Sequence, residues 1–389
     1  HARRDIAIAA ELRKIRTDLE IHWLAQDPVT RVLAAAGEQL HPASAHLLGE
    51  SAHLEREAGE HDLHVFDAIR RMDETMIANF MVFAELVAED PPDLVIADEA
   101  WEVDHYLHEN PPDLKNFEFA WLTDFVGWLP MPDGGAREAA LTADYNARCS
   151  STGNGIRACG TARYSSGIPT MSSSRISVPT YRASASGPSA TTTSAVTCWD
   201  RPPRLPDRSE TRCAAGSNSS PSIGSVWSPS AERRWVRRCC SGSCRRPPLV
   251  RRAIPELHFL VVTGPRIDPA TLPRRQGGVR VRGFVPDLAD YLAACDIAVV
   301  QGGLSTCMEL TSAGTPFVYV PLEHHFEQNI HVRHRLERYA AGRRMRYAEA
   351  ADPDLLAKII VDEMTADSSF RPVETDGAMR AAAMLAELL

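Results

Sequence analysis

The sequence contains no run of about 18 apolar residues, so we expect no transmembrane helix. It also lacks an excess of basic residues, because its 389 residues carry a net charge of −9, which argues against a general nucleic-acid-binding protein. The first residue is His1, and the residues after it lack the pattern of a signal peptide. We therefore expect a cytoplasmic chain that has lost a short N-terminal piece and is long enough for two domains. Peripheral contact with a membrane stays open.

Residues 149–248 lack most of what a packed domain needs. They contain one leucine, Leu205, and no phenylalanine or lysine, while serine, arginine, proline and cysteine dominate. Seven of the nine cysteines fall here, so we draw no conclusion about disulfides from their number. We interpret this abnormal middle segment as low-complexity and either disordered or translated out of frame. A shifted frame around residues 225–240 would encode a strand and a glycine loop that we otherwise expect to be absent.

The most informative stretch runs from Ala294 to His331. Ile297–Val300 is an apolar, β-branched run that predicts a buried strand, and the glycine pair after it allows a tight turn. We expect Ser305 or Thr306 to cap a helix that ends at Gly314, and a second strand over Phe317–Val320. A strand, glycine turn, helix and strand form a βαβ unit, whose helix N-terminus is suited to bind a phosphate group.

This stretch resembles the nucleotide-sugar signature of GT-B glycosyltransferases, most closely the peptidoglycan N-acetylglucosaminyltransferase branch (family 28) and also the UDP-glycosyltransferases. The resemblance rests on residues that share the family's order and spacing: Gly302, Gly303, Ser305, Thr306, Glu309, Ala313, Gly314, Pro316, Pro321 and Gln328. It implies that the glycine turn and the helix start hold the diphosphate, that Glu309 binds the ribose hydroxyls, and that Gln328 contacts the donor sugar. It also implies that the loop containing Phe284 recognises the uracil ring. Gln301 departs from the family, because many members carry histidine there.

Two residues of the N-terminal half are candidates for catalysis. The run that begins at His1 resembles the start of the first GT-B helix, where the family often has a histidine that acts as general base. Asp98 directly follows the apolar run Leu94–Ala97, and the carboxyl ends of parallel strands are where α/β sheets bind ligands. We expect Asp98 to orient a base or the acceptor.

The resemblance predicts an α/β, GT-B-like fold with two Rossmann-like domains that face a cleft. We place an acceptor-side domain at residues 1–148, without its first strand, the abnormal segment at 149–248, and the nucleotide-sugar domain at 249–389. Outside the central motif, the patterns predict further elements. Helices are expected over 1–16, 28–36, 288–295, 331–346, 355–364 and 378–389, and strands over 19–24, 94–97, 117–122, 257–263 and 279–283.

The implied reaction moves a sugar from a UDP-sugar donor to the hydroxyl of an acceptor, which is a small molecule, a lipid or a glycan. No cofactor and no metal are expected. His324 and His325 are adjacent, so they do not share a helix face, and no third ligand has regular spacing. Two alternatives stay open: a nucleotide-sugar epimerase of similar fold, and a catalytically dead frameshifted product. Because two loops of the site would be missing, we expect impaired activity.

Overall fold

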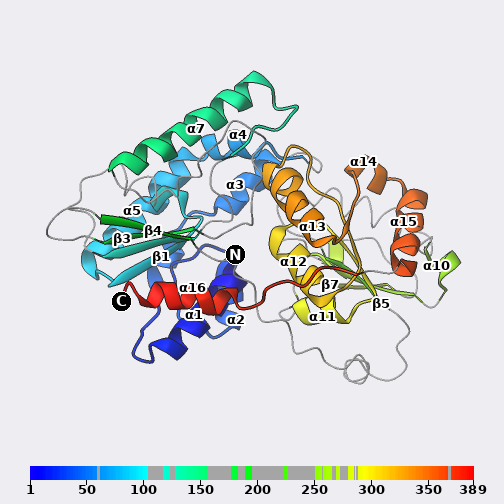
Figure 1. Cartoon of the computed structure of the whole chain (residues 1–389), viewed down its shortest axis with the longest axis horizontal. Coiled ribbons are helices and arrows are strands. Elements are labelled where there is room, and N and C mark those ends of the chain that lie inside the picture. The colour runs from blue at the N-terminus through cyan, green and yellow to red at the C-terminus, as the bar shows by residue number, and fades with distance from the viewer. Residues whose placement is uncertain are drawn as a thin grey trace. The chain divides into compact units, whose positions relative to one another are not determined.

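The computed structural model describes residues 1–58, 62–103, 117–122, 128–155, 177–182, 189–194, 222–226, 250–255, 257–264, 269–271, 279–283, 285, 288–366 and 369–389. Its contacts divide the chain into two compact units (Figure 1). Unit 1 comprises His1–His53, Phe66–Asp200 and Glu374–Leu389, and unit 2 comprises Leu54–Val65 and Arg201–Val373.

Unit 1 is built on a four-stranded sheet in the order β1-β2-β3-β4. The strands β1 (Leu94–Asp98) and β2 (Glu118–Leu122) are parallel, whereas β3 (Ser177–Arg182) and β4 (Ser189–Ser194) continue the sheet in antiparallel fashion. Both predicted strands, 94–97 and 117–122, are therefore confirmed. The helices that begin in this unit are α1 (Ala2–Ile15), α2 (Val29–Ala35), α3 (Glu50–Glu57), α5 (Asp73–Glu89), α7 (Gly135–Gly155) and α16 (Gly377–Ala386), with η1 at Pro42–His46; α4 (Val65–Arg70) starts at the unit boundary.

The C-terminal helix α16 packs in the same core as the first helix, and Figure 1 shows the two side by side. Ile8 and Leu12 of α1 meet Ala381 and Leu385 of α16, and all four side chains are buried. Buried side chains of β2 complete this cluster. Both ends of the described sequence thus contribute to the core of one unit.

The predicted strand over 19–24 is wrong. Trp23 makes only an isolated bridge with Leu40, in which the Trp23 N–H donates to the Gln39 carbonyl at 2.9 Å. The β-branched and aromatic composition was suitable, but a strand needs a neighbour along its whole length to pair its backbone groups.

Unit 2 is built on a six-stranded sheet in the order β10-β9-β8-β5-β6-β7, in which each strand is parallel to its neighbours. Its strands are β5 (Ser222–Val226), β6 (His258–Val262), β7 (Val279–Arg282), β8 (Ile297–Val300), β9 (Phe317–Tyr319) and β10 (Arg343–Arg344). Its helices are α10 (Val250–Ala253), α11 (Leu288–Ala294), α12 (Leu304–Ala313), η4 (Glu327–Val332, a π-helical segment), α13 (Arg333–Tyr339), α14 (Tyr347–Ala350) and α15 (Pro353–Thr365), with η3 at Pro269–Thr271. Parallel strands alternating with helices confirm the expected α/β class.

All four residues of β8 are buried, and Ile297 and Val299 pack against Ile359 and Ile360 of α15. A parallel sheet covered in this way has apolar residues at consecutive positions, which is why the sequence predicted this strand correctly. The predicted helix over 331–346 is shorter than expected. It ends at Tyr339, because Ala340 and Gly342 take left-handed backbone conformations with φ of 52° and 66°.

Three strands come from residues 149–248, which the sequence led us to interpret as disordered or out of frame. One of them, β5, pairs with both β6 and β8, so the chain as written supplies the strand that we expected to be absent. The segment 227–249 after β5, where the glycine loop was expected, lies outside the described residues. The frameshift and the arrangement of the two domains around a cleft stay predictions.

Candidate functional site

The turn after β8 has the backbone geometry that only glycine adopts readily. Gly302 has φ of 114°, and a Cβ placed on it would lie 3.4 Å from the Tyr319 ring and 3.6 Å from the Cα of Pro321. Gly303 has an ordinary φ of −64°, but a Cβ placed on it would meet no atom within 4 Å. Gly302 is therefore needed for the turn itself, whereas Gly303 leaves open space at the start of α12.

Gly303 is the N-cap residue of α12, and no side chain caps this helix. The expectation that Ser305 or Thr306 serves as the cap is wrong, since both lie within the first turn of α12. The first N–H groups of a helix have no partner within it and carry the positive end of the helix dipole. By contrast, Asp352 caps α15 by accepting hydrogen bonds from the N–H groups of Asp354 and Leu355. The start of α12 is therefore suited to bind an anion.

Two glutamines lie beside the turn. Gln301 is 2% exposed, and neither its Oε1 nor its Nε2 has a hydrogen-bond partner. A buried amide without partners is costly, which marks this position as one that a ligand could satisfy. Gln328 is also buried, and its Oε1 accepts a hydrogen bond from the Leu322 N–H at 2.8 Å. That hydrogen bond joins the loop that begins at Pro321 to the start of η4.

Glu309 lies in α12, half-buried, on the turn of helix after Ser305. Its carboxylate is close enough to the buried thiol of Cys307 to affect it: burial, followed by the negative charges of Glu327 and Glu309, raises the pKa of Cys307 above its usual range. Cys295 and Cys307 are both buried free thiols. Phe284 lies outside the described residues.

Unit 1 brings the two catalytic candidates together. His1 Nδ1 lies 3.0 Å from Asp98 Oδ2, and Asp98 is the last residue of β1. The side chain of His1 is 51% exposed, whereas that of Asp98 is only 10% exposed. When Nδ1–H donates to Asp98, the other ring nitrogen, Nε2, is the one that can accept a proton.

Two further residues of α1 complete this cluster, and the sequence analysis did not identify them. The Arg4 guanidinium forms an ion pair with Asp98, and its Nη2 lies 3.0 Å from His1 Nδ1. Asp5 forms a side-chain hydrogen bond with Asp98. The signal was present in the sequence, because positions 4 and 5 follow His1 by three and four residues and so lie on the same helix face.

The charges of the cluster determine which acid is ionised. Burial alone would raise the pKa of Asp98, but the positive charges of His1 and Arg4 and the hydrogen bonds to it lower that pKa below its usual range. Burial and the charge of Asp98 raise the pKa of Asp5 well above its usual range. Asp98 is therefore the ionised partner of His1, and Asp5 favours the protonated form that can donate to Asp98.

The chain matches known glycosyltransferases both in sequence and in fold. Residues 240–386 match the glycosyltransferase family 28 C-terminal domain. Solved structures similar to the chain include the glycotransferase of kitacinnamycin (TM-score 0.52, 15% identity, covering 98% of this chain and 95% of that one). The spinosyn rhamnosyltransferase SpnG complexed with thymidine diphosphate is also similar (TM-score 0.52, 14% identity, 99% and 93% covered). The chain has the GT-B glycosyltransferase fold of these structures.

Relatives found by sequence comparison match this chain over a shorter length. An uncharacterized glycosyltransferase of Methanosarcina acetivorans is 30% identical over 146 residues, which are 36% of this chain and 38% of the relative. The UDP-N-acetylglucosamine–N-acetylmuramyl-(pentapeptide) pyrophosphoryl-undecaprenol N-acetylglucosamine transferase of Thermobifida fusca is 40% identical over 68 residues, 17% of this chain and 18% of the relative. The matched stretches thus span less than two fifths of these relatives. The resemblance to GT-B enzymes and family 28 is confirmed.

Within the described part of the chain, no helix is both long and apolar enough to span a bilayer.

Proposed function

We propose that this protein is a glycosyltransferase that moves a sugar from a UDP-sugar to an acceptor hydroxyl. The observation that carries the proposal is the uncapped N-terminus of α12, which follows a buried parallel strand and a glycine turn with open space above Gly303. The diphosphate of the donor would bind there, since free N–H groups and the helix dipole both favour a negative charge. The match of residues 240–386 to a family 28 domain supports the same assignment.

In this proposal, the donor is held by residues on three sides of the turn. The N–H groups at Gly303 to Thr306 and the hydroxyls of Ser305 and Thr306 contact the diphosphate, and Glu309 accepts hydrogen bonds from the ribose hydroxyls. Gln328 faces the donor sugar, and recognition of the uracil is assigned to the loop containing Phe284 by the resemblance alone, because Phe284 lies outside the described residues. As the bond to the leaving diphosphate breaks, negative charge grows on its oxygens, and oriented N–H donors stabilise that charge.

His1 would remove the proton from the acceptor hydroxyl. Its Nε2 is the basic nitrogen when Nδ1–H donates to Asp98, and the ionised Asp98 stabilises the imidazolium that forms. Arg4 keeps Asp98 ionised, which fixes the direction of that hydrogen bond. The acceptor class, the absence of a cofactor, the cytoplasmic location and impaired activity stay predictions.

Calorimetric titration of UDP tests the donor site. Glu309→Ala removes a charged acceptor for the ribose, so affinity should fall by about 1.5–3 kcal/mol, or about 10- to 150-fold. Glu337→Ala, on the solvent-exposed side of α13, is the matched control and should bind as the wild type does. Equal affinity in all three proteins would remove Glu309 from the site.

The same titration with thymidine diphosphate tests the base, since the similar protein SpnG has been solved with that ligand. Tighter binding of UDP supports the proposed donor, whereas tighter binding of thymidine diphosphate would replace it. A panel of UDP-sugars, assayed for transfer and for hydrolysis, then tests activity. Binding without turnover would favour the catalytically dead alternative. The epimerase alternative, which the family 28 match does not favour, predicts a changed sugar with no acceptor present.

A further inference from the structure

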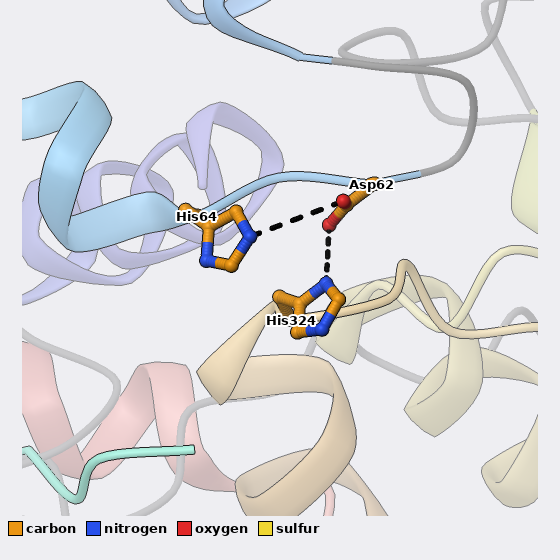
Figure 2. A group of neighbouring side chains, drawn as sticks. All are labelled: Asp62, His64 and His324. Atoms are coloured by element: carbon orange, nitrogen blue, oxygen red, sulfur yellow. Dashed lines mark hydrogen bonds and ion pairs between the residues drawn. The ribbon is translucent and has the colours of Figure 1, made fainter. Parts of the chain in front are cut away.

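Three side chains with metal-binding groups meet in unit 2, and none of them is among the residues assigned above. They are Asp62, His64 and His324, and Figure 2 shows them converging from two segments of the chain. Asp62 and His324 are 262 residues apart in sequence, yet Asp62 Oδ1 lies 2.7 Å from His324 Nδ1. The ligand atoms of the three residues all lie within 4.8 Å of one another.

The backbone fixes both segments. Asp62 forms a parallel bridge with Glu323, and the N–H of Leu63 donates to the Glu323 carbonyl at 3.1 Å. In such an extended segment, successive side chains point to opposite sides. Leu63 is accordingly 3% exposed, while Asp62 and His64, two residues apart, both project toward His324.

His324 is held in an uncommon conformation. Its φ is 59°, in the left-handed region that residues other than glycine enter rarely and at a cost. This conformation puts its imidazole beside that of His64: the rings stack with centroids 4.4 Å apart and planes inclined by 14°. Backbone strain of this kind persists where the surrounding structure enforces it, and such positions cluster at functional sites.

We propose that Asp62, His64 and His324 form a binding site for a divalent transition-metal cation, with zinc as the best fit. Two imidazole nitrogens and one carboxylate oxygen are ligands that zinc prefers, whereas magnesium and calcium favour oxygen donors. Bonds of about 2.0–2.2 Å in a tetrahedral site bring neighbouring ligand atoms to about 3.3 Å. His64 Nε2 and Asp62 Oδ2, now 3.9 Å apart, would have to approach by about 0.6 Å to reach that spacing.

To bind one cation, the two stacked imidazole rings would also have to turn so that a nitrogen of each faces it. The exposed fractions of the side chains are 35% for Asp62, 46% for His64 and 25% for His324, so water can reach the site and occupy a fourth position. A bound cation would link the segment around Leu63 to the loop that leads into η4, which contains Gln328. The proposal departs from the expectation of no metal at His324, because the partners of His324 come from residues far away in the sequence. It stands independently of the proposed transferase activity.

Zinc binding is tested by calorimetry on the full chain, purified without a histidine tag and treated with a chelator. Because the chain has many cysteines, accessible thiols are first blocked with N-ethylmaleimide. One cation per chain should bind, and Asp62→Asn, His64→Gln and His324→Gln should each weaken binding about tenfold or more. Magnesium should not compete. His334→Gln, which changes an exposed histidine of α13 in the same unit, should bind zinc as the wild type does.

Two measurements separate loss of ligand from loss of fold. Circular dichroism and the metal-free melting temperature of each variant should match those of the wild type. Cobalt substituted for zinc should give a visible absorption band that each of the three variants loses. Absence of zinc binding to the wild-type chain, or undiminished binding by folded variants at all three positions, would overturn the proposal.

Discussion

Stability should fall as the pH rises through neutrality, because a buried acid, Glu102, must stay protonated in the folded chain. Glu102 is 8% exposed in unit 1. Burial, followed by the negative charge of Glu50, raises the pKa of Glu102 to about 8 from an ordinary 4.5. Glu50 is itself held by the amides of Gln26 and Asn79, at 2.7 and 3.3 Å.

The direction of this pH dependence follows from whether the folded or the unfolded chain binds the proton of Glu102. Between pH 4.5 and about 8 the folded chain keeps the proton on Glu102, whereas the unfolded chain has released it. Unfolding therefore releases a proton, so the free energy of unfolding decreases with rising pH across this window. The difference between the two pKa values corresponds to about 5 kcal/mol at most, of which about 3 kcal/mol is lost by pH 7.

Urea unfolding of the wild type and of Glu102→Gln at pH 5, 6, 7 and 8 measures this effect. Glutamine cannot ionise, so the variant should lack this part of the pH dependence and become the more stable protein at pH 8. Glu50→Gln removes the neighbouring charge and should reduce the slope for Glu102 without abolishing it. Glu89→Gln, at the exposed end of α5, controls for the loss of a surface charge. Parallel curves for wild type and Glu102→Gln would refute the reasoning.

Other substitutions test the site and the core. Gly302→Ala should destabilise the chain by about 1–3 kcal/mol, because alanine is strained at φ of 114°. Gly303→Ala should preserve the melting temperature and weaken UDP binding, because a Cβ at Gly303 meets no protein atom within 4 Å. Equal melting temperatures for the two variants would contradict this. Asp98→Asn should lower kcat about 10²–10⁴-fold, since His1 loses the charge that stabilises its protonated form, and unchanged turnover would remove the pair from the mechanism. Leu385→Ala in α16 should cost about 2–5 kcal/mol by urea unfolding, because this side chain is fully buried against α1; a cost below 1 kcal/mol would argue against that packing.

The βα segment around the glycine turn is determined by the sequence itself. The strand Ile297–Val300 was predicted with its observed bounds, and Gly314 ends α12 with φ of 66°, as the position of a glycine after a helix indicates. These features depend on short-range physics: consecutive apolar residues suit a strand covered on both faces, and glycine tolerates left-handed backbone. The sequence also made His1 a candidate, through the resemblance of its run to the first GT-B helix, and separately made Asp98 one, through its position at a strand end.

Features that depend on contacts between residues far apart in the chain were determined only by the tertiary structure. Residues 19–24 have strand composition but no continuous neighbour, so they form a single bridge. The 3.0 Å contact between His1 and Asp98, and the pKa values it sets, exist only because α1 packs against the sheet of unit 1. The group of Asp62, His64 and His324 is the clearest case. No local spacing in the sequence relates residues 262 positions apart, and the backbone bridge at Glu323 is what brings their side chains together.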